Sequence, residues 1–425
     1  MEFHRFTLSN GINVLVAPMV SSAPVSVQVW LPCGFRMETK HEVSISHLTE
    51  HMVFLRGGRD YPNARSVERL FRMIGGKGNA ATSEEFVFYY LVTSPRNIRQ
   101  AVHLLSDMVV HARIDPADLE SERKRVFREM KFTLDDPEDF SERKFKRFIY
   151  GDNSLGWLDF ELTEPLSRFT VEDVRRFKER FYGPPNMVIS VAGGIPPFEV
   201  HELLEEYFGA MTQRERVKWL EFCPEANLPP TEILLRGDVS QAHLHIGGFA
   251  PSCKSQELRL SVLLHEVLSY RLWSRLVVGG GLYTAFAEPR THTDAGNFLV
   301  YAGVDADAAA ITEVMRVIFS EMADIKSGHI SAEELEEART LRHAVVDLGL
   351  EGVSMIASFL ASYELNVGRA KTVEELHQEV DMVTKDGLIR LAQEIWKEES
   401  VRSLLLTNSF PRFEEKYCEL RKVLR

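Results

Sequence analysis

The chain has 425 residues, of which 44% are hydrophobic, and its formal net charge at pH 7 is −12. This length predicts about two or three domains, and the apolar content excludes a disordered chain. The acidic balance argues against a nucleic-acid-binding protein, which needs a basic face, and disfavours an acidic membrane surface as a partner.

The N-terminal sequence and the cysteines indicate the cellular compartment of the protein. Met1–Phe6 shows no basic segment followed by an apolar one, so no secretory signal is visible. No apolar run approaches the roughly 20 residues that span a bilayer. Cys33, Cys223, Cys253 and Cys418 are far apart and form no Cys-x-x-Cys pair, which is typical of reduced thiols. We therefore predict a cytoplasmic protein without a membrane partner.

The first half of the chain shows strand and helix patterns in turn. Apolar and β-branched runs, the first closed by an Asn-Gly turn, predict strands, and longer periodic stretches predict helices. The expected strands are Phe6–Gly11, Val25–Leu31, a pair around Gly75–Asn79, Phe86–Val92 and Asn186–Gly193. The expected helices are His47–Arg56, residues 96–111, residues 116–134 and one that ends near Phe208.

The second half repeats this order. Its expected elements are a strand at Ala242–Phe249, a helix at Leu258–Leu276, a strand at Gly296–Gly303 and a helix at 308–326. The segment Ile330–Arg339 copies Ile114–Arg123 almost position for position, at an offset of 216. This self-similarity indicates a duplicated domain.

An irregular segment that contains Pro224, Pro229 and Pro230 separates the halves, and its composition is typical of a linker. We therefore predict homologous domains at 1–212 and 232–425, joined by a linker at 213–231. The expected fold class is α+β, with each domain an antiparallel-rich sheet packed with helices on one face.

The first of the expected helices carries a metal-site pattern. His47 and His51 lie four residues apart, which places both imidazoles on one helix face, where they can take two corners of a tetrahedral zinc site. Glu50 lies between them and can reach a water on the metal without binding the metal itself. The order His-x-x-Glu-His is a known zinc-peptidase signature. The alternative interpretation is a solvated helix with surface histidines.

A zinc peptidase needs a third protein ligand. The helix after Pro116 carries Glu122 and Glu129, seven residues apart and therefore on one face. Either carboxylate could complete a His₂Glu site with one position left for water. Either could equally be a surface charge, because this helix is rich in charged residues, and the spacing leaves both interpretations open.

The internal repeat offers an independent test of these positions. At the offset of 216, the second half has Leu263 where the first has His47, Val267 where it has His51, and Val345 where it has Glu129. Polar candidates in one copy and apolar residues in the other predict one working metal site and one lapsed site.

Taken together, these segments make the chain resemble the inverzincin peptidases of the pitrilysin and mitochondrial-processing-peptidase family, in particular their short bacterial members with two domains. The resemblance covers nearly the whole chain. It rests on Leu8–Gly11, Ile45–Met52, Gly75–Ser83, Glu122–Arg123, Glu129 and Val191–Gly193.

The resemblance implies the roles of the site residues. It makes His47, His51 and Glu129 the ligands of one zinc ion per chain, Glu50 the general base, and Glu122 a carboxylate that supports the site. The implied activity is that of a zinc metalloendopeptidase, which hydrolyses peptides or unfolded precursor segments through a zinc-bound water.

The resemblance also implies where the substrate binds. In such enzymes the segment that corresponds to Asn79, Ala80, Ala81 and Thr82 lies on a sheet edge near the metal, and an extended peptide adds there as a further strand. For Asn79 the alternative is a turn residue after Gly78. For the other three it is ordinary strand packing.

One segment departs from the family pattern. Family members that work alone or as homodimers carry a glycine turn, a Ser-Arg-Leu helix and a Gly-Leu-x-Tyr strand whose Arg and Tyr contact the substrate. Here Ser274–Leu276 and Gly281–Tyr283 are recognisable, but the stretch between them is short and the expected Arg is missing. Tyr283 could still bind substrate and Arg275 could substitute. Otherwise Tyr283 is a strand aromatic and Arg275 a helix surface charge.

This departure leads to a prediction about assembly. The first half of the chain has all the proposed metal ligands, whereas the substrate-binding segment of the second half is incomplete. This combination favours a heterodimer, in which a homologous non-catalytic subunit supplies the missing residues. The alternative is a homodimer. Two other functions stay open, a non-catalytic scaffold subunit of a larger complex and, more weakly supported, simple metal storage.

Overall fold

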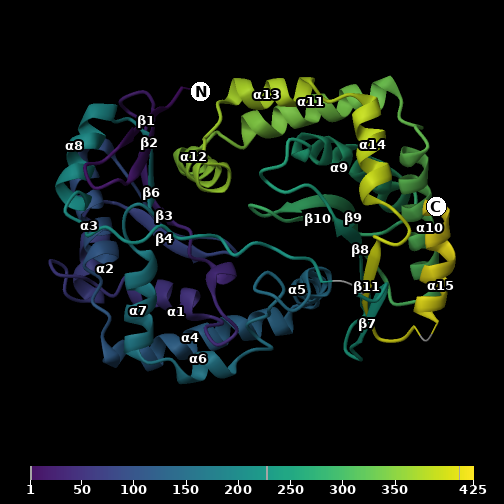
Figure 1. The fold of residues 1–425 in the computed structure, drawn as a ribbon, viewed down its shortest axis with the longest axis horizontal. Coiled ribbons are helices and arrows are strands. Elements are labelled where there is room, and N and C mark those ends of the chain that lie inside the picture. The colour runs from purple at the N-terminus through teal and green to yellow at the C-terminus, as the bar shows by residue number, and fades with distance from the viewer. Residues whose placement is uncertain (1, 226–227, 411) are drawn as a thin grey trace. The chain divides into compact units, whose positions relative to one another are not determined.

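The computed structural model describes residues 2–225, 228–410 and 412–425 (Figure 1). The described residues form two compact units, and each unit is built from three separate segments of the chain. The first unit comprises 1–131, 159–220 and 347–374, and the second comprises 132–158, 221–346 and 375–425.

The first unit contains a six-stranded sheet in the order β1-β2-β6-β3-β5-β4. All pairs are antiparallel except β2 with β6. The two central strands, β6 and β3, are buried along their whole length. The strands are β1 (His4–Thr7), β2 (Asn13–Pro18), β3 (Val25–Leu31), β4 (Lys77–Thr82), β5 (Val87–Thr93) and β6 (Val188–Gly193).

Helices cover one face of this sheet and bury its main apolar core. Val14 and Val16 of β2 point into this core, whereas Leu15 and Ala17 belong to a separate cluster, as the two-residue period of a strand requires. The helices of the first unit are α1 (Ile45–Val53), α2 (Ala64–Met73), α3 (Ile98–Val110), α4 (Pro116–Asp135, mainly in this unit), α6 (Glu164–Arg168), α7 (Val171–Phe181), α8 (Pro197–Phe208) and α12 (Val353–Val367).

The second unit contains a five-stranded sheet in the order β7-β11-β8-β10-β9, in which only β7 and β11 run parallel. Its strands are β7 (Thr231–Leu235), β8 (Gln241–Phe249), β9 (Thr284–Thr291), β10 (Gly296–Asp305) and β11 (Arg402–Thr407). Its helices are α5 (Pro137–Tyr150), α9 (Leu258–Leu272), the π-helical η3 (Trp273–Val278), α10 (Ala308–Lys326), α11 (Ala332–Leu348), α13 (Val373–Asp381), α14 (Lys385–Ile395) and α15 (Phe413–Leu420).

The two sheets share one topology. The order β2-β6-β3-β5-β4 corresponds strand for strand to β7-β11-β8-β10-β9, with the same parallel pair at one end. Only β1 has no counterpart in the described part of the second sheet. The predicted class, α+β with two homologous domains that have antiparallel-rich sheets, is confirmed, and the helices predicted on one face of each sheet are joined by one further helix on the opposite face.

Each sheet also has a second apolar face, and one helix from the other half of the sequence covers it. In the first unit, α12 lies against this face of the sheet (Figure 1), and its Ile356 and Leu360 belong to one apolar cluster with Leu15 and Val188. In the second unit, α5 packs Phe145 and Phe148 against the sheet in the same way. The compact units are therefore discontinuous in sequence, while the predicted division into 1–212, 213–231 and 232–425 stays a prediction about the duplicated sequence blocks.

No single described helix is long and apolar enough to cross a bilayer, although the bent pair of α11 and α12 passes on length and composition together.

Candidate metal centre

Helix α1 presents the two histidines, and a buried carboxylate fixes where the helix begins. Glu38 accepts hydrogen bonds from the backbone nitrogens of Ser44 and Ser46, at 2.8 and 2.9 Å, so it binds N–H groups that no helical carbonyl can reach. Leu48 and Met52 are fully buried on the core side of α1. The other side of the helix therefore carries His47 and His51, as the four-residue spacing predicts.

Three atoms converge beside this helix. Nε2 of His47 and Nε2 of His51 are 3.2 Å apart, and Oε2 of Glu129 lies 3.2 Å from the first and 3.4 Å from the second. Two ligands at corners of a tetrahedral zinc site, with bonds of about 2.0–2.1 Å, are separated by about 3.3–3.4 Å. The three atoms therefore fit one triangular face of a zinc coordination tetrahedron.

Helix α4 supplies the carboxylate of this triangle. Asp115 accepts a hydrogen bond from the backbone nitrogen of Ala117 and so caps the N-terminus of α4. Glu129 and Glu122 lie two turns apart on the same face. Glu129 joins the two imidazoles, whereas Glu122 lies behind His51, so the structure separates two carboxylates that the sequence pattern could not distinguish.

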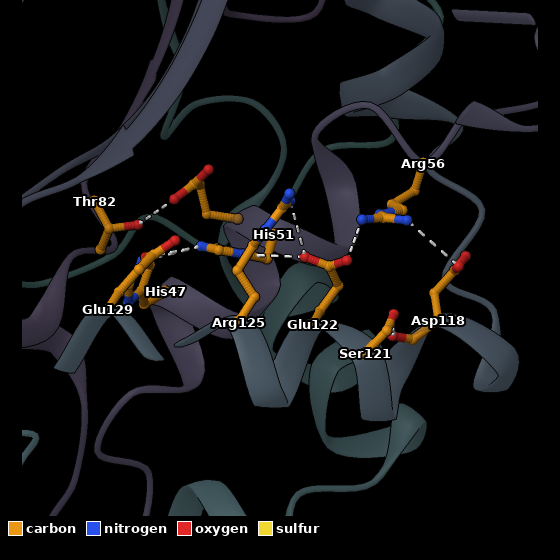
Figure 2. A network of polar contacts seen from close by, with 10 residues as sticks. His47, His51, Arg56, Thr82, Asp118, Ser121, Glu122, Arg125 and Glu129 are labelled. Carbon is orange, nitrogen blue, oxygen red and sulfur yellow. Dashed lines mark hydrogen bonds and ion pairs between the residues drawn. The ribbon is translucent and has the colours of Figure 1, made fainter. Parts of the chain in front are cut away.

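Glu122 contacts His51 and Arg56 outside the triangle (Figure 2). Its side chain is 3% exposed, and Oε2 lies 3.1 Å from His51 Nδ1. Oε1 accepts a hydrogen bond from Arg56 Nη2, and Arg56 Nη1 lies 3.6 Å from Asp118 Oδ1. Burial opposes the ionised form of Glu122, but the bond to His51 and the charge of Arg56 outweigh it and lower the pKa of this carboxyl.

The electrostatics of the triangle favour a cation. Burial alone would lower the pKa of His51, but hydrogen bonds to Glu122 and Glu129 raise it to about 9. Burial likewise acts against ionised Glu129, yet the two histidines hold its pKa well below the usual range. The carboxylates thus stabilise positive charge at this point, which a divalent metal can supply in place of a proton.

Glu50 lies next to the triangle, close to the same two histidines. One carboxylate oxygen of Glu50 and one ring nitrogen of each histidine all lie within 4.8 Å of one another. Glu50 is 7% exposed, and burial raises its pKa, although the histidine charges oppose the shift. Thr82 Oγ1 donates to Glu50 Oε2 at 3.4 Å, which ties this carboxylate to β4. A carboxyl with a raised pKa beside a metal can accept a proton near neutral pH.

The cluster opens into a cavity of about 810 Å³. The predicted segment Asn79–Thr82 lines it, and β4, which carries this segment, is the edge strand of the sheet, with only β5 as a strand neighbour among the described residues. Phe54 and Phe71 give the cavity an apolar part, while Glu68 and Arg125 add charges. An extended peptide could pair with the free edge of β4 next to Glu50.

The two predicted substrate contacts of the second half lie in the second unit. Arg275, which is 45% exposed, forms an ion pair with the buried Glu321. Tyr283 is 91% exposed and lies just before β9. Their roles stay predictions.

A single offset of 216 residues does not relate all the helices of the two halves, so it matches the predicted counterparts of the metal ligands only in part. α11 begins 216 residues after α4, but α9 begins 213 residues after α1, because the intervening loops differ in length. Leu263 and Val267 are buried in the second core, and Val345 is 41% exposed. Among the described residues, the group of His47, Glu50 and His51 is the only cluster of its kind.

Arg56 and Glu38 are site residues that the sequence analysis did not identify. Both lie in irregular segments that flank α1, and neither belongs to the His-x-x-Glu-His pattern. A partly buried Arg or a buried Glu in a loop gives no periodic signal, so only the contacts reveal their roles.

Comparison with known proteins places the chain among peptidases. The family model described as "Insulinase (Peptidase family M16)" matches residues 14–157, and the model described as "Peptidase M16 inactive domain" matches residues 168–342. An uncharacterized zinc protease from Bacillus subtilis (strain 168) is 28% identical over 407 residues, which cover 94% of this chain and 97% of that protein.

Solved structures show the same fold. A protease from Helicobacter pylori superposes with a TM-score of 0.85 at 21% identity, over 96% of this chain and 99% of that one. A chain in complex III2 from Candida albicans gives 0.84 at 16% identity, over 99% of each chain.

Proposed function

Since the chain belongs to the M16 peptidase family and is a zinc peptidase, we propose that it is an endopeptidase that cleaves extended peptides at the triangle of His47, His51 and Glu129. The observation that carries this proposal is the match between the three ligand-atom separations and one face of a zinc tetrahedron, with Glu50 beside it. One zinc ion per chain follows from one such triangle.

The residues around the triangle have separate roles in hydrolysis. A zinc ion held there supplies a Lewis acid that makes water nucleophilic near neutral pH and polarises the scissile carbonyl. Glu50 takes the proton from the attacking water and delivers it to the leaving amine, for which its raised pKa is suited. Glu122 holds the His51 imidazole by its Nδ1–H group.

The substrate adds to the sheet along β4. Backbone hydrogen bonds to the edge at Asn79–Thr82 place the scissile peptide beside Glu50, which touches Thr82. Such binding needs an extended backbone and little sequence, so the preferred substrates are unfolded peptides or precursor segments. We propose that this reaction takes place in the cytoplasm, which cell fractionation would test.

We further propose that the chain is the catalytic subunit of a heterodimer. The support is the shortened segment before Tyr283 and the engagement of Arg275 with Glu321, which leaves that Arg poorly available for substrate. A homologous subunit without metal ligands would then raise cleavage well above that of the chain alone. Full activity of the purified chain alone would favour the homodimer or a monomer.

Replacement of the proposed base tests the function. Glu50→Gln should retain zinc and lose cleavage of a fluorogenic peptide library by about 10²–10⁴-fold, the usual contribution of a positioned general base. Glu120→Gln, a change of an exposed α4 carboxyl that pairs with Arg123 and does not line the cavity, is the matched control and should stay close to the wild type. Zinc measurement on each variant separates loss of the base from loss of the metal.

The second candidate function is a non-catalytic scaffold subunit. The likeness to a chain of complex III2 shows that this fold also occurs in a large assembly. Purified protein that holds no zinc and cleaves no peptide, even with a homologous partner, would favour this function. The complete triangle of ligand atoms favours the peptidase.

A further inference from the structure

Arg56 lies behind the carboxylate that supports His51. It follows the C-terminus of α1, and its side chain is 21% exposed. Its guanidinium donates to Glu122 Oε1 through Nη2 and lies 3.6 Å from Asp118 Oδ1 through Nη1. Glu122 Oε2 lies 3.1 Å from His51 Nδ1. The four side chains form one series of contacts that ends at a proposed zinc ligand (Figure 2).

This series can fix the plane of the Glu122 carboxylate. The terminal torsion of a glutamate is broad, so burial alone does not orient its two oxygens. A guanidinium bonded to one oxygen restricts that torsion, since charge-assisted hydrogen bonds are short and directional. With Oε1 held by Arg56, Oε2 is left to accept from His51 Nδ1–H, which directs Nε2 of the same ring toward Glu129 and His47.

The two histidines differ in this support. His47 Nδ1 is buried and makes no hydrogen bond to any residue that the structure describes. On the side away from the triangle, the His47 ring is held by packing, including an edge contact with Phe35 at 6.2 Å between centroids. His51 is therefore the ligand whose orientation rests on hydrogen bonds, and these lead back through Glu122 to Arg56.

We propose that Arg56 is a positioning residue of the zinc centre, which orients His51 by fixing the plane of Glu122. This inference rests on the zinc site proposed above. It goes further because it assigns a role in metal binding to a loop residue that lies outside the ligand motif.

Arg56 also lines the cavity, so an effect on substrate has to be separated from an effect on metal. Arg125 provides the control, because it lines the same cavity and its Nη1 lies 3.5 Å from Glu122 Oε2. Its side chain is 56% exposed, and it approaches the oxygen that His51 already uses. Arg125 thus carries the same charge near the same carboxylate without holding Oε1.

The test measures zinc affinity of the full chain without substrate, by competition with a chromophoric chelator. Arg56→Met should weaken zinc binding about 10-fold, the lower end of the effect of supporting residues on metal affinity. Arg56→Lys keeps a donor that can reach Oε1 and should fall between wild type and Arg56→Met. Arg125→Met should stay close to wild type.

A double-mutant cycle then tests whether Arg56 affects zinc affinity through Glu122. In a Glu122→Gln background, Arg56→Met should cause little further loss, because both changes remove the same support. Arg56→Gln serves as the neutral replacement if Arg56→Met does not fold, as judged by thermal unfolding of the metal-free variants.

The inference would be overturned by unchanged affinity in Arg56→Met, by an equal loss in Arg125→Met, or by full additivity with Glu122→Gln. A lysine variant no better than Arg56→Met would also contradict it. Absence of zinc from the wild-type chain would instead overturn the proposed function, so the two failures are distinguishable.

Discussion

Glu129 is 42% exposed on a helix that is rich in charged residues, yet its Oε2 lies within 3.4 Å of both imidazole nitrogens. Because the three atoms define one face of a tetrahedron, loss of this carboxylate leaves two ligands where zinc requires at least three from the protein. We expect Glu129→Gln to weaken zinc binding by more than the roughly 10–100-fold that loss of a supporting residue costs, as measured by chelator competition.

The control for this change lies on the same helix. Glu120 is 59% exposed and pairs with Arg123, so Glu120→Gln alters the same helix charge without touching the triangle. Equal zinc affinities of the two variants would remove Glu129 from the ligand set and leave the two histidines without a protein carboxylate.

The sequence predicts some parts of this site better than others. The four-residue spacing of His47 and His51 places them together through helix geometry alone. Glu129 lies far along the chain, so its approach depends on how α4 packs, and only the family resemblance separated it from Glu122. Arg56 follows a residue with a left-handed backbone, Leu55 at φ 61°, and no periodic pattern predicts where such a turn directs its neighbour.

At the scale of elements, α12 gives the clearest prediction. Leu360 is fully buried between this helix and the second face of the first sheet. Truncation of a buried Leu removes its contacts and leaves a cavity, so we expect Leu360→Ala to reduce the free energy of unfolding by about 2–5 kcal/mol. Chemical denaturation would measure this loss.

Met355 on the same helix provides the matched control. It is 56% exposed, so Met355→Ala should change the free energy of unfolding by no more than about 0.5 kcal/mol. A similar small effect of Leu360→Ala would mean that α12 does not close this face of the sheet in solution.

The sequence could not assign α12 or α5 to their sheets. Periodicity reports that a segment is helical and which of its faces is apolar, but both helices pack on strands from the other half of the chain. By contrast, α1, α3, α4 and α10 lie close to the predicted ranges, because each has a strong helical pattern of its own. Long-range pairing, rather than local structure, limits the prediction.

At the scale of the whole molecule, duplication explains both what is shared and what differs. Two sheets of one topology need only apolar strands at equivalent positions, which the repeat retains. The metal triangle needs three particular side chains, which α1 and α4 supply in the first unit, and the only metal-binding group found among the described residues contains the same two histidines. The second copy is thus free to bury other polar groups, and it does so under α5.

His245 is the most consequential of these groups for stability. It is 1% exposed on β8, lies against Phe145 of α5 and bonds to Ser141 Oγ at 2.9 Å. Burial, with smaller contributions from His243 and Arg290, lowers its pKa to about 3. The unfolded chain binds a proton at this position below about pH 6.5, whereas the folded chain stays neutral down to about 3.

The protonation of His245 in the unfolded chain therefore leaves the free energy of unfolding unchanged above about pH 6.5. It lowers this free energy progressively as the pH falls from 6.5 toward 3. One proton taken up on unfolding gives a slope of at most about 1.4 kcal/mol per pH unit in this window. His245→Gln, which has no titrating group, should reduce the slope by about that amount in calorimetric unfolding between pH 4 and 6. An unaltered slope in His245→Gln would show that this imidazole is protonated without unfolding, and that the second sheet admits charge beneath α5.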